Sequence, residues 1–335
     1  MSRARPARRP GVRRPRVPER AAGRERGIAL ITAILLVALG TIIAVEMGYQ
    51  NAMTARRAEA TYALDQSVLL AEGGEALAGY ALRESLKGAT QVYPGQPWSM
   101  PYGPVEVIPG VTLQAQLEDM SGRFNLNLLV GKNGQINQDA VTRFEQLLTL
   151  IGLEPKWADL IADWIDADQI PLPEGAEDSV YLSQSPPYRA ANRYITSPSE
   201  LLALPGFGRD RYLRIAPFVA ALPYDGSSIN LCSASGPVLD ALGPPGQRQF
   251  STMTAQDLAK QRADGCFPTK TEFDAGFGGD RGAQKASDLM VAETSNYFRL
   301  TSVITIGTTQ FALYSLLVRQ DPAHVRVFQR SFTAD

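Results

Sequence analysis

The sequence predicts an α+β fold, in which a long N-terminal helix packs on a small antiparallel sheet and a large all-helical insertion interrupts that sheet. Three observations support this prediction. An uncharged apolar run over residues 27–45 opens a long stretch without proline. Strand-like alternation occurs at 111–119 and returns only after residue 295. Between these two regions, apolar residues recur at helical spacing.

The apolar run has 19 residues, from Gly27 to Val45, and is just long enough to cross a membrane, because a hydrocarbon core of ~30 Å takes about 20 helical residues. A secretory leader is the weaker interpretation, since its apolar core has about 7–15 residues and ends in small residues, whereas this run ends at Glu46. The first 27 residues hold ten Arg and two Glu, which should keep the N-terminus in the cytoplasm. Binding of nucleic acid or anionic lipid is the alternative use of this Arg/Pro-rich segment.

The chain after residue 27 is acidic, with 23 basic and 32 acidic residues, which disfavours a nucleic-acid-binding body. Cys232 and Cys266 would most simply form one disulfide in an exported body, with two buried free thiols as the alternative. His324 is the single histidine of the sequence, and a lone histidine is more often structural than catalytic. No G-x-S-x-G, H-E-x-x-H or Walker A pattern occurs, so the sequence disfavours an enzyme, including a membrane-anchored hydrolase.

The periodicity of the sequence divides the chain into segments. Residues 47–87 contain no proline and continue the first helix, with a bend or close packing expected at Gly73-Gly74. Val111 to Asp119 alternates as a strand with one wet face, and the C-terminal region predicts two strands around Gly307 with a third after His324. The predicted divisions are a leader 1–27, a transmembrane segment 28–46, an amphipathic helix 47–92, a first sheet part 93–130, a helical insertion 131–290 and C-terminal strands 291–335.

Four helical segments are expected in the insertion. Apolar stripes predict helices over 139–152 and 154–168. A third helix should begin at Ser197, with Pro198 at its first position and Glu200 completing a capping box. After the Pro205-Gly206 break, a fourth helix should cover 207–222.

The N-terminal layout of basic leader, glycine, apolar helix, amphipathic helix and small sheet resembles that of type IV pilin-like precursors. In that family a membrane peptidase cuts after the glycine. The resemblance therefore implies cleavage between Gly27 and Ile28, with the apolar run retained as an anchor; an uncleaved single-span protein is the alternative. Family members usually carry Glu at the fifth mature position, and this chain has Thr32 there. A subunit without that carboxylate loses one contact to its neighbour and suits the end of a filament.

The Thr32 substitution together with a large helical insert resembles the minor pseudopilin K family of type II secretion systems (general secretion pathway protein K). Three segments strengthen the resemblance: "LEDMSGRFNLNLL" at 117–129, the long motif at 163–208 beginning "DWIDADQIPLPEGAEDSVY", and the C-terminal strand pair. It implies a type IV pilin-like fold and a place at the tip of a pseudopilus that exports folded proteins. It also implies a single-pass inner-membrane protein of a Gram-negative bacterium, with a cytoplasmic N-terminus and a periplasmic body.

The implied partners are minor pseudopilins I and J, with H as a further candidate, the prepilin peptidase and the inner-membrane assembly platform, and methylation is also implied. The runner-up is a minor pilin of a type IV pilus or DNA-uptake machine. Its DNA contact would be the "LPGFG" turn at 204–208, which resembles a helix-hairpin-helix whose backbone N–H groups can face a phosphate. The acidic charge of the body disfavours that use.

An acidic loop lies between Lys156 and Arg189, where the sequence has seven acids and no basic residue. Oxygen ligands without nearby Cys or His suit Ca²⁺ better than Zn²⁺, although a solvated acidic loop is the simpler interpretation of spacing alone. The resemblance favours the ion, because the helical domain of that family binds calcium. The preferred ligands are Asp166, Asp168, Glu177 and Asp178, with Asp163 and Glu174 as further candidates.

Overall fold

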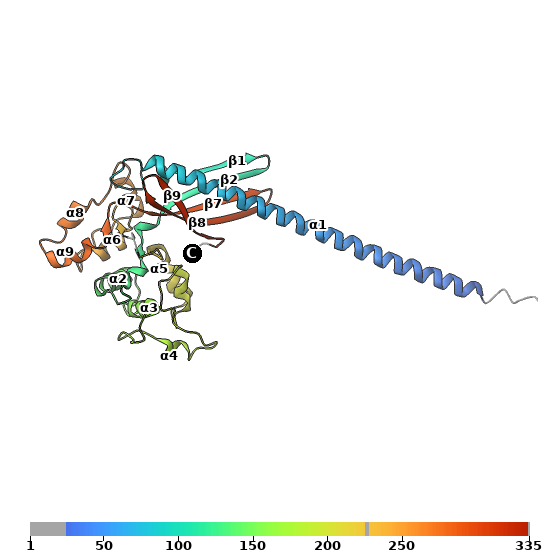
Figure 1. Ribbon diagram of the computed structural model, residues 1–335, viewed down its shortest axis with the longest axis horizontal. Helices are drawn as coiled ribbons and strands as arrows, with labels where there is room; N and C mark the ends of the chain where they lie inside the picture. Colours follow the sequence, from blue (N-terminus) through green and yellow to red (C-terminus); the bar gives the residue numbers. More distant parts are fainter. Residues whose placement is uncertain (1–24, 225–227, 334–335) are drawn as a thin grey trace, which may run out of the picture. The chain divides into compact units, whose positions relative to one another are not determined.

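The computed structural model describes residues 25–224 and 228–333, in two compact units, 1–63 and 64–335. Helix α1 (Glu25–Ser85) contributes to both units. Of the predicted leader, residues 1–24 lie outside the described residues. The remaining elements all belong to the second unit, where the C-terminal part of α1 lies along an antiparallel sheet and a group of helices follows from it (Figure 1).

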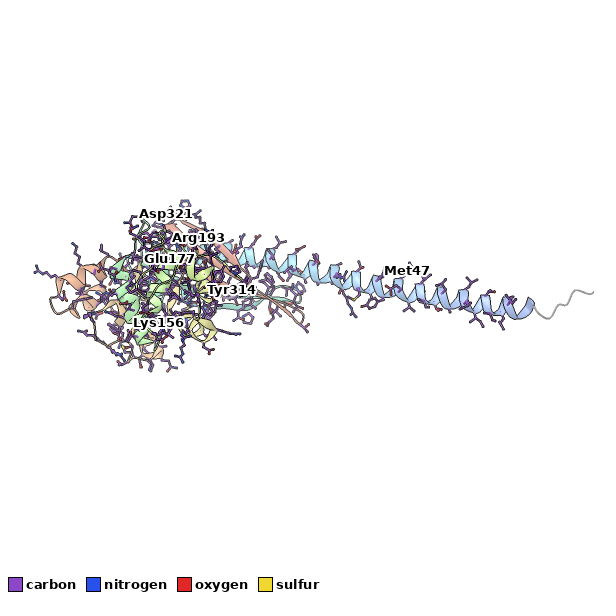
Figure 2. The ribbon with its side chains drawn as sticks, turned by 90° about the horizontal axis from the view of Figure 1, so that it is seen from below. Met47, Lys156, Glu177, Arg193, Tyr314 and Asp321 are labelled. Atoms are coloured by element: carbon purple, nitrogen blue, oxygen red, sulfur yellow. A yellow bond between two sulfur atoms is a disulfide. The ribbon has the colours of Figure 1, made fainter. Side chains whose placement is uncertain are left out.

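The described part of the first unit is a helix with the properties of a membrane span. From Ile28 onward α1 is long enough and apolar enough to cross a bilayer, and it is the one such helix among the described residues. The side chains of its apolar window are all exposed, including Leu35 and Ile42, and Met47 near the end of this stretch points outward as well (Figure 2). Among the described residues of this unit, none covers the apolar side chains of 28–46, as is expected of a lipid-facing helix.

The sheet has the strand order β1-β2-β7-β8-β9, with neighbouring strands antiparallel throughout. Its strands are β1 (Tyr102–Ile108), β2 (Val111–Asp119), β7 (Tyr297–Ile306), β8 (Thr309–Asp321) and β9 (His324–Ser331). The predicted turn at Gly307 joins β7 to β8, and its φ of 60° suits a glycine. The predicted α+β fold is thus confirmed, with sheet strands on both sides of a long insertion in the sequence.

The sheet edge β1 was not expected from the sequence. Pro104 cannot donate a ladder hydrogen bond, and two irregularities in the pairing with β2 flank Val105-Glu106. These features break the alternation that a strand normally shows. They also blunt an edge strand that is exposed along its whole length.

The C-terminal part of α1 packs on one face of the sheet. Ala78 and Leu82 of the helix, and Leu86 just after its end, share a buried cluster with Leu117 and Phe298 of the sheet, among other residues. One turn earlier, a Cβ on Gly74 would lie 3.3 Å from Ser302 Oγ, so this glycine lets the helix approach the sheet closely. Of the two predicted alternatives at Gly73-Gly74, a bend or close packing, the structure shows close packing at Gly74, within a helix unbroken to Ser85.

The insertion is mainly helical. Its α-helices are α2 (Gln138–Leu150), α3 (Trp157–Ile165), α4 (Asp178–Tyr181), α5 (Gly208–Ile215), α6 (Gly236–Leu242), α7 (Ala255–Gln261), α8 (Lys270–Ala275) and α9 (Arg281–Asp288). The 3₁₀ helices of the unit are η1 (Pro97–Ser99), η2 (Met120–Gly122), η3 (Leu126–Leu129), η4 (Pro198–Ala203) and η5 (Ala216–Phe218). Two short parallel pairs complete the structure: β3 (Phe124–Asn125) with β4 (Val219–Ala220), and β5 (Ile229–Asn230) with β6 (Val291–Ala292).

Two local predictions in the insertion were wrong in part. The helix expected over 207–222 ends at Ile215, because Pro217 interrupts it and Val219-Ala220 pair with β3. The helix expected at Ser197 is the 3₁₀ helix η4. Ser197 does cap it by accepting a hydrogen bond from the backbone N–H of Ser199, and Glu200 accepts hydrogen bonds from the backbone N–H and hydroxyl of Thr196.

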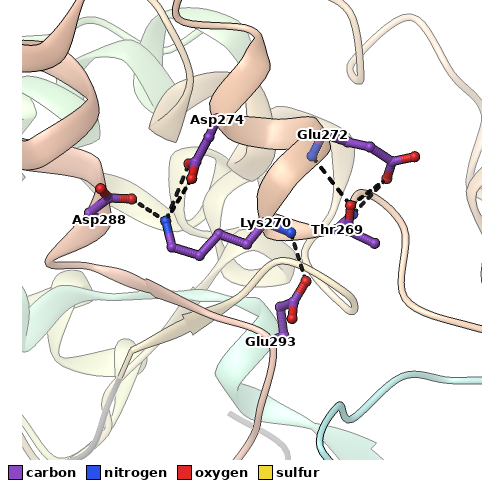
Figure 3. A network of polar contacts seen from close by, with 6 residues as sticks. All are labelled: Thr269, Lys270, Glu272, Asp274, Asp288 and Glu293. Atoms are coloured by element: carbon purple, nitrogen blue, oxygen red, sulfur yellow. Dashed lines mark hydrogen bonds and ion pairs between the residues drawn. The ribbon is translucent and has the colours of Figure 1, made fainter.

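Polar contacts join the insertion to the sheet. The buried carboxylate of Asp119, at the end of β2, accepts hydrogen bonds from Asn230, Ser233 and Ser295. Glu293 lies two residues ahead of Ser295, and its carboxylate accepts a hydrogen bond from the backbone N–H of Lys270 at 2.7 Å (Figure 3). These contacts bring the start of β7 and the middle of the insertion together.

The same junction contains an ion-pair cluster and the disulfide. Lys270 Nζ contacts the carboxylates of Asp274 and Asp288, which fastens α8 to the end of α9 (Figure 3). Cys232 and Cys266 form a disulfide, which confirms that prediction over the alternative of two free thiols. The bridge closes the part of the insertion that contains α6 and α7.

Candidate metal centre

Three acidic side chains meet where α3 ends and α4 begins. Asp163 lies on the last turn of α3, Asp166 is its C-cap, and Glu177 is the N-cap of α4. The i, i+3 spacing of the two aspartates places them on the same side of the helix end. One carboxylate oxygen from each of the three residues lies within 4.8 Å of the others.

The three carboxylates are buried and mostly without hydrogen-bond partners. Asp163 is 0%, Asp166 2% and Glu177 4% exposed. Asp163 accepts a hydrogen bond from the backbone N–H of Leu172, 3.0 Å from Oδ2. In contrast, Asp166 Oδ1 and both carboxylate oxygens of Glu177 are buried and have no protein donor. Since an unpaired buried carboxylate is costly, these oxygens indicate a site that needs a positive charge.

Burial and neighbouring negative charges raise the pKa values of all three carboxyl groups. Burial raises the pKa of Asp163 to about 7, with the neighbouring charges of Asp166 and Asp159 adding to the effect. Burial, followed by the charge of Asp163, raises the pKa of Glu177 to about 7. The pKa of Asp166 is raised to about 6, again first by burial. Like charges are therefore held close together in a place where water cannot solvate them.

Two features around the cluster define its walls. A Cβ on Gly175 would lie 1.8 Å from Asp163 Oδ2, so only glycine lets the loop pass this close to the carboxylate. On another side lies an aromatic group in which the rings of Trp164 and Tyr181 are 5.0 Å apart and those of Tyr181 and Tyr188 are 5.5 Å apart. The fully buried hydroxyl of Tyr181 has no partner, and burial raises its pKa, with the charges of Asp163 and Glu177 adding to the effect.

The other acids predicted as ligands have different surroundings. Asp168 Oδ1 accepts a hydrogen bond from the backbone N–H of Ile170. Asp178 accepts one from the N–H of Ala190 and pairs with Arg189. Glu174 is exposed.

The structure thus groups Asp166 and Glu177, from the preferred set, with Asp163, which the sequence placed among the further candidates. Asp168 and Asp178 contribute negative potential to Glu177 rather than joining the group of oxygens within 4.8 Å. The i, i+3 spacing of Asp163 and Asp166, which places both on the same side of a helix, is the feature of the sequence that could have identified Asp163 as a member of this group.

The residues present fit a hard divalent cation. The donors are carboxylate oxygens, no Cys or His belongs to the group, and three of the buried oxygens have no other partner. Ca²⁺ takes oxygen ligands of this kind in irregular loops, whereas Zn²⁺ prefers nitrogen and sulfur.

The predicted phosphate-binding turn at 204–208 has a different arrangement. Gly206 and Gly208 do adopt positive φ. However, Arg211 donates to the carbonyl oxygens of Gly206 and Phe207, and its guanidinium lies 5.0 Å from the centre of the Trp157 ring. This arginine therefore holds the turn together and is not directed at an outside phosphate.

In the apolar part of α1, the hydroxyl of Thr32 is hydrogen-bonded to backbone carbonyl oxygens of the same helix. Its Oγ1 lies 3.1 Å from the carbonyl oxygen of Ile28 and 3.0 Å from that of Ala29, both within α1. A Thr or Ser hydroxyl that bonds the preceding turn needs no partner from another chain. The apolar segment can thus present this position to lipid or to a neighbouring helix without an unpaired polar group.

Comparisons with known proteins agree with these features. A family model described as "Type II secretion system (T2SS), protein K" matches residues 122–224, which include the acidic cluster. The chain is 35% identical to the type II secretion system protein K of Pseudomonas aeruginosa over 319 residues, which cover 91% of this chain and 92% of that protein. It is 29% identical to the protein of the same name from Pectobacterium carotovorum subsp. carotovorum over 324 residues, 92% of this chain and 97% of that one.

A solved structure shares the fold. One chain in the crystal structure of the GspK-GspI-GspJ complex from the enterotoxigenic Escherichia coli type 2 secretion system superposes with a TM-score of 0.72 and 27% sequence identity. The match covers 83% of this chain and 100% of that chain. The fold of most of this chain therefore occurs in a protein of known structure.

Proposed function

Because the chain belongs to the type II secretion system protein K family and is thus a minor pseudopilin, we propose that it occupies the tip of a pseudopilus. There it takes part in starting the filament and in the export of folded proteins across the outer membrane. The observation that carries this proposal is the state of Thr32, whose hydroxyl is bonded inside its own helix. A pilin subunit inside a filament needs a carboxylate at this position to pair with the α-amino group of its neighbour, and a tip subunit does not.

The outer face of α1 in the second unit supports assembly with other helices. Leu69, Leu77 and Tyr80 are exposed there, at 57–68%, on the side turned away from the buried residues Ala71 and Ala78. Gly73 lies among them with open space around it. An apolar stripe with a small residue in its middle suits close packing against another helix. The solved relative occurs in a complex with GspI and GspJ, so pseudopilins I and J are the proposed partners of this chain, with H as a further candidate.

Processing and topology follow from the N-terminal segment. The prepilin peptidase cuts between Gly27 and Ile28, the new N-terminus is methylated, and the helix from Ile28 remains in the inner membrane. The N-terminus faces the cytoplasm, where the assembly platform receives the subunit, and the body lies in the periplasm. Sequencing the N-terminus of the membrane-extracted protein tests this step. A first residue of Ile28 is expected, and a first residue of Met1 would remove the proposed maturation.

Tip placement has its own test. Pseudopili are assembled with a chain that carries an epitope on the exposed loop around Ile170, and the bound antibody is located by electron microscopy. Label at one end of each filament is expected. Label repeated along the shaft would contradict the proposal, and a tagged major subunit serves as the control for access of the antibody.

We further propose that Asp163, Asp166 and Glu177 hold a Ca²⁺ ion. The bound ion supplies positive charge to oxygens that have no protein donor. These residues join the end of α3 to the start of α4, so ion binding closes the loop between them and stabilises a region with little regular secondary structure. At a free concentration of 100 times Kd, a ligand that binds only the folded state adds about 2.7 kcal/mol to the free energy of unfolding.

Calorimetry of the detergent-solubilised full chain tests this site. The melting temperature should fall on addition of EGTA and recover with excess Ca²⁺. In the Glu177→Gln variant, the calcium dependence should be lost, while the melting temperature in EGTA stays at or above that of the wild type because one repulsive charge is gone. A wild-type scan that neither EGTA nor Ca²⁺ moves would remove the ion from this site.

A further inference from the structure

Asn192 has an unusual backbone conformation beside the acidic cluster. Its φ is 46°, and it is the only non-glycine residue with positive φ in the part of the chain that the structure describes. Asn tolerates the left-handed region better than most residues, yet the conformation still occurs mainly where surrounding contacts impose it. Those contacts come from the segment that carries Asp166.

Two hydrogen bonds fasten Asn192 around Asp166. The backbone N–H of Asn192 donates to the carbonyl oxygen of Trp164 at 3.0 Å. Its side-chain Nδ2 donates to the carbonyl oxygen of Asp168 at 3.3 Å. These two carbonyls lie two residues before and two residues after Asp166, so Asn192 spans the turn that presents this carboxylate.

The remaining polar atom of this side chain is an oxygen with no partner. Asn192 Oδ1 is buried and accepts no hydrogen bond, as is also true of Asp166 Oδ1 and the two carboxylate oxygens of Glu177. Since Nδ2 is committed to Asp168, the amide cannot be turned to relieve its oxygen without losing that bond. Four buried oxygens without donors are therefore supplied by residues that lie around one turn.

We propose that Asn192 Oδ1 is a neutral ligand of the cation held by Asp163, Asp166 and Glu177. This inference rests on the proposed cation site. Ca²⁺ takes about 6–8 oxygens and commonly includes amide carbonyls among them. Three carboxylates already carry one negative charge more than the ion neutralises, so a neutral oxygen completes the ligand set without adding repulsion.

The chemistry also explains the loop that follows α4. Asn192 lies 15 residues after Glu177 in the sequence, and with this ligand the ion joins three segments: the end of α3, the start of α4, and the chain after Arg189. Coordination of the ion by Asn192 then offsets the energetic cost of its left-handed backbone conformation.

Two variants separate a ligand from a turn residue. Asn192→Gly keeps the positive φ at no steric cost but deletes the amide. Asn192→Asp keeps an oxygen at the Oδ1 position and replaces the Nδ2 donor by an acceptor. The full chain in detergent is titrated with Tb³⁺, whose luminescence Trp164 and Tyr181 can sensitise, and bound Tb³⁺ is then displaced by Ca²⁺ to give the affinity. Melting temperatures in EGTA report the effect of each variant on the ion-free fold.

A ligand role predicts that Asn192→Gly weakens cation affinity by about tenfold or more, while Asn192→Asp stays near the wild-type affinity or exceeds it. If Asn192→Asp loses as much cation affinity as Asn192→Gly, the hydrogen bond from Nδ2 to the carbonyl oxygen of Asp168 accounts for the whole loss, and the ligand role is refuted. Wild-type affinity in Asn192→Gly would refute it as well. If the wild-type chain binds neither Tb³⁺ nor Ca²⁺, the cation site itself fails, whereas the assignment as a minor pseudopilin is untouched.

Discussion

Removing the partner of a buried glutamate should destabilise the packing of α1 on the sheet. Glu75 is 5% exposed where α1 meets the strands. Its Oε1 accepts hydrogen bonds from Ser315 Oγ at 2.6 Å and Arg330 Nε at 2.8 Å, and its Oε2 accepts one from Arg330 Nη2 at 2.7 Å. In Arg330→Met, Oε2 keeps no partner and the negative charge stays between helix and sheet.

The expected magnitude follows from the exposure of the two side chains. Breaking a fully buried pair costs about 3–5 kcal/mol because a charge is left uncompensated. The side chain of Arg330 is 45% exposed, so water can partly replace it, and Ser315 remains. We therefore expect Arg330→Met to lower the free energy of unfolding by about 2–3 kcal/mol. Glu75→Gln leaves only a partly exposed arginine, and should cost about 1 kcal/mol.

Urea unfolding of the full chain in detergent, followed by tryptophan fluorescence and circular dichroism, measures both variants. The decisive result is whether Arg330→Met lowers the free energy of unfolding more than Glu75→Gln does, because Glu75 is the buried charge and Arg330 is partly exposed. The double variant should be less destabilised than the sum of the single ones, because neither charge is then left alone. If Arg330→Met costs no more than Glu75→Gln, the reasoning about the buried charge is wrong.

Four further predictions concern the acidic site and the disulfide. Calcium affinity should fall between pH 8 and pH 6, because the pKa values of Asp163 and Glu177 are raised to about 7 and these carboxyls must lose protons to bind the ion; titration calorimetry measures this. Without calcium, pH has the opposite effect on stability, which increases as the pH falls. The folded state keeps protons that the unfolded state has lost, so the melting temperature in EGTA should rise as pH falls from 8 towards 5 and be lowest above pH 7; a flat profile would contradict the raised pKa values. Gly175→Ala should abolish calcium-dependent stabilisation, because its Cβ would fall on Asp163, while Gly265→Ala, which has open space around it, serves as the matched control. Replacing both cysteines by alanine should lower the free energy of unfolding by about 3–4 kcal/mol for a loop closed over a separation of 34 residues; an unchanged urea midpoint would show that the disulfide does not stabilise the fold.

The sequence predicted those parts of the structure whose cause is local. The apolar run before Glu46, the alternation of 111–119 and the helical stripe of 139–152 each depend on residues a few positions apart. Each has its counterpart in the structure, the last as the helix Gln138–Leu150. The pairing of Cys232 with Cys266 was predictable because two cysteines allow one intramolecular disulfide. The edge strand β1 escaped prediction, because Pro104 and two irregularities in pairing hide its alternation.

The acidic site shows where local reasoning ends. Seven acids between Lys156 and Arg189 predicted a cluster, but their order in the sequence did not show which would share one buried space. Asp163 enters it from a helix turn, Gly175 lets the loop approach it, and Asn192, 29 residues after Asp163 in the chain, donates a hydrogen bond to the carbonyl oxygen of Asp168 nearby.

The contact between Glu75 and Arg330 spans 255 positions in the sequence. No periodicity contains such a pair, because it exists only after β9 has aligned with β8 beneath the helix. The sequence by itself determined most of the helical and extended segments and the apolar segment long enough to span a membrane, since backbone preference and side-chain spacing act over a few residues. Tertiary structure alone decided which charges became buried together, because burial depends on segments that meet only in the folded chain.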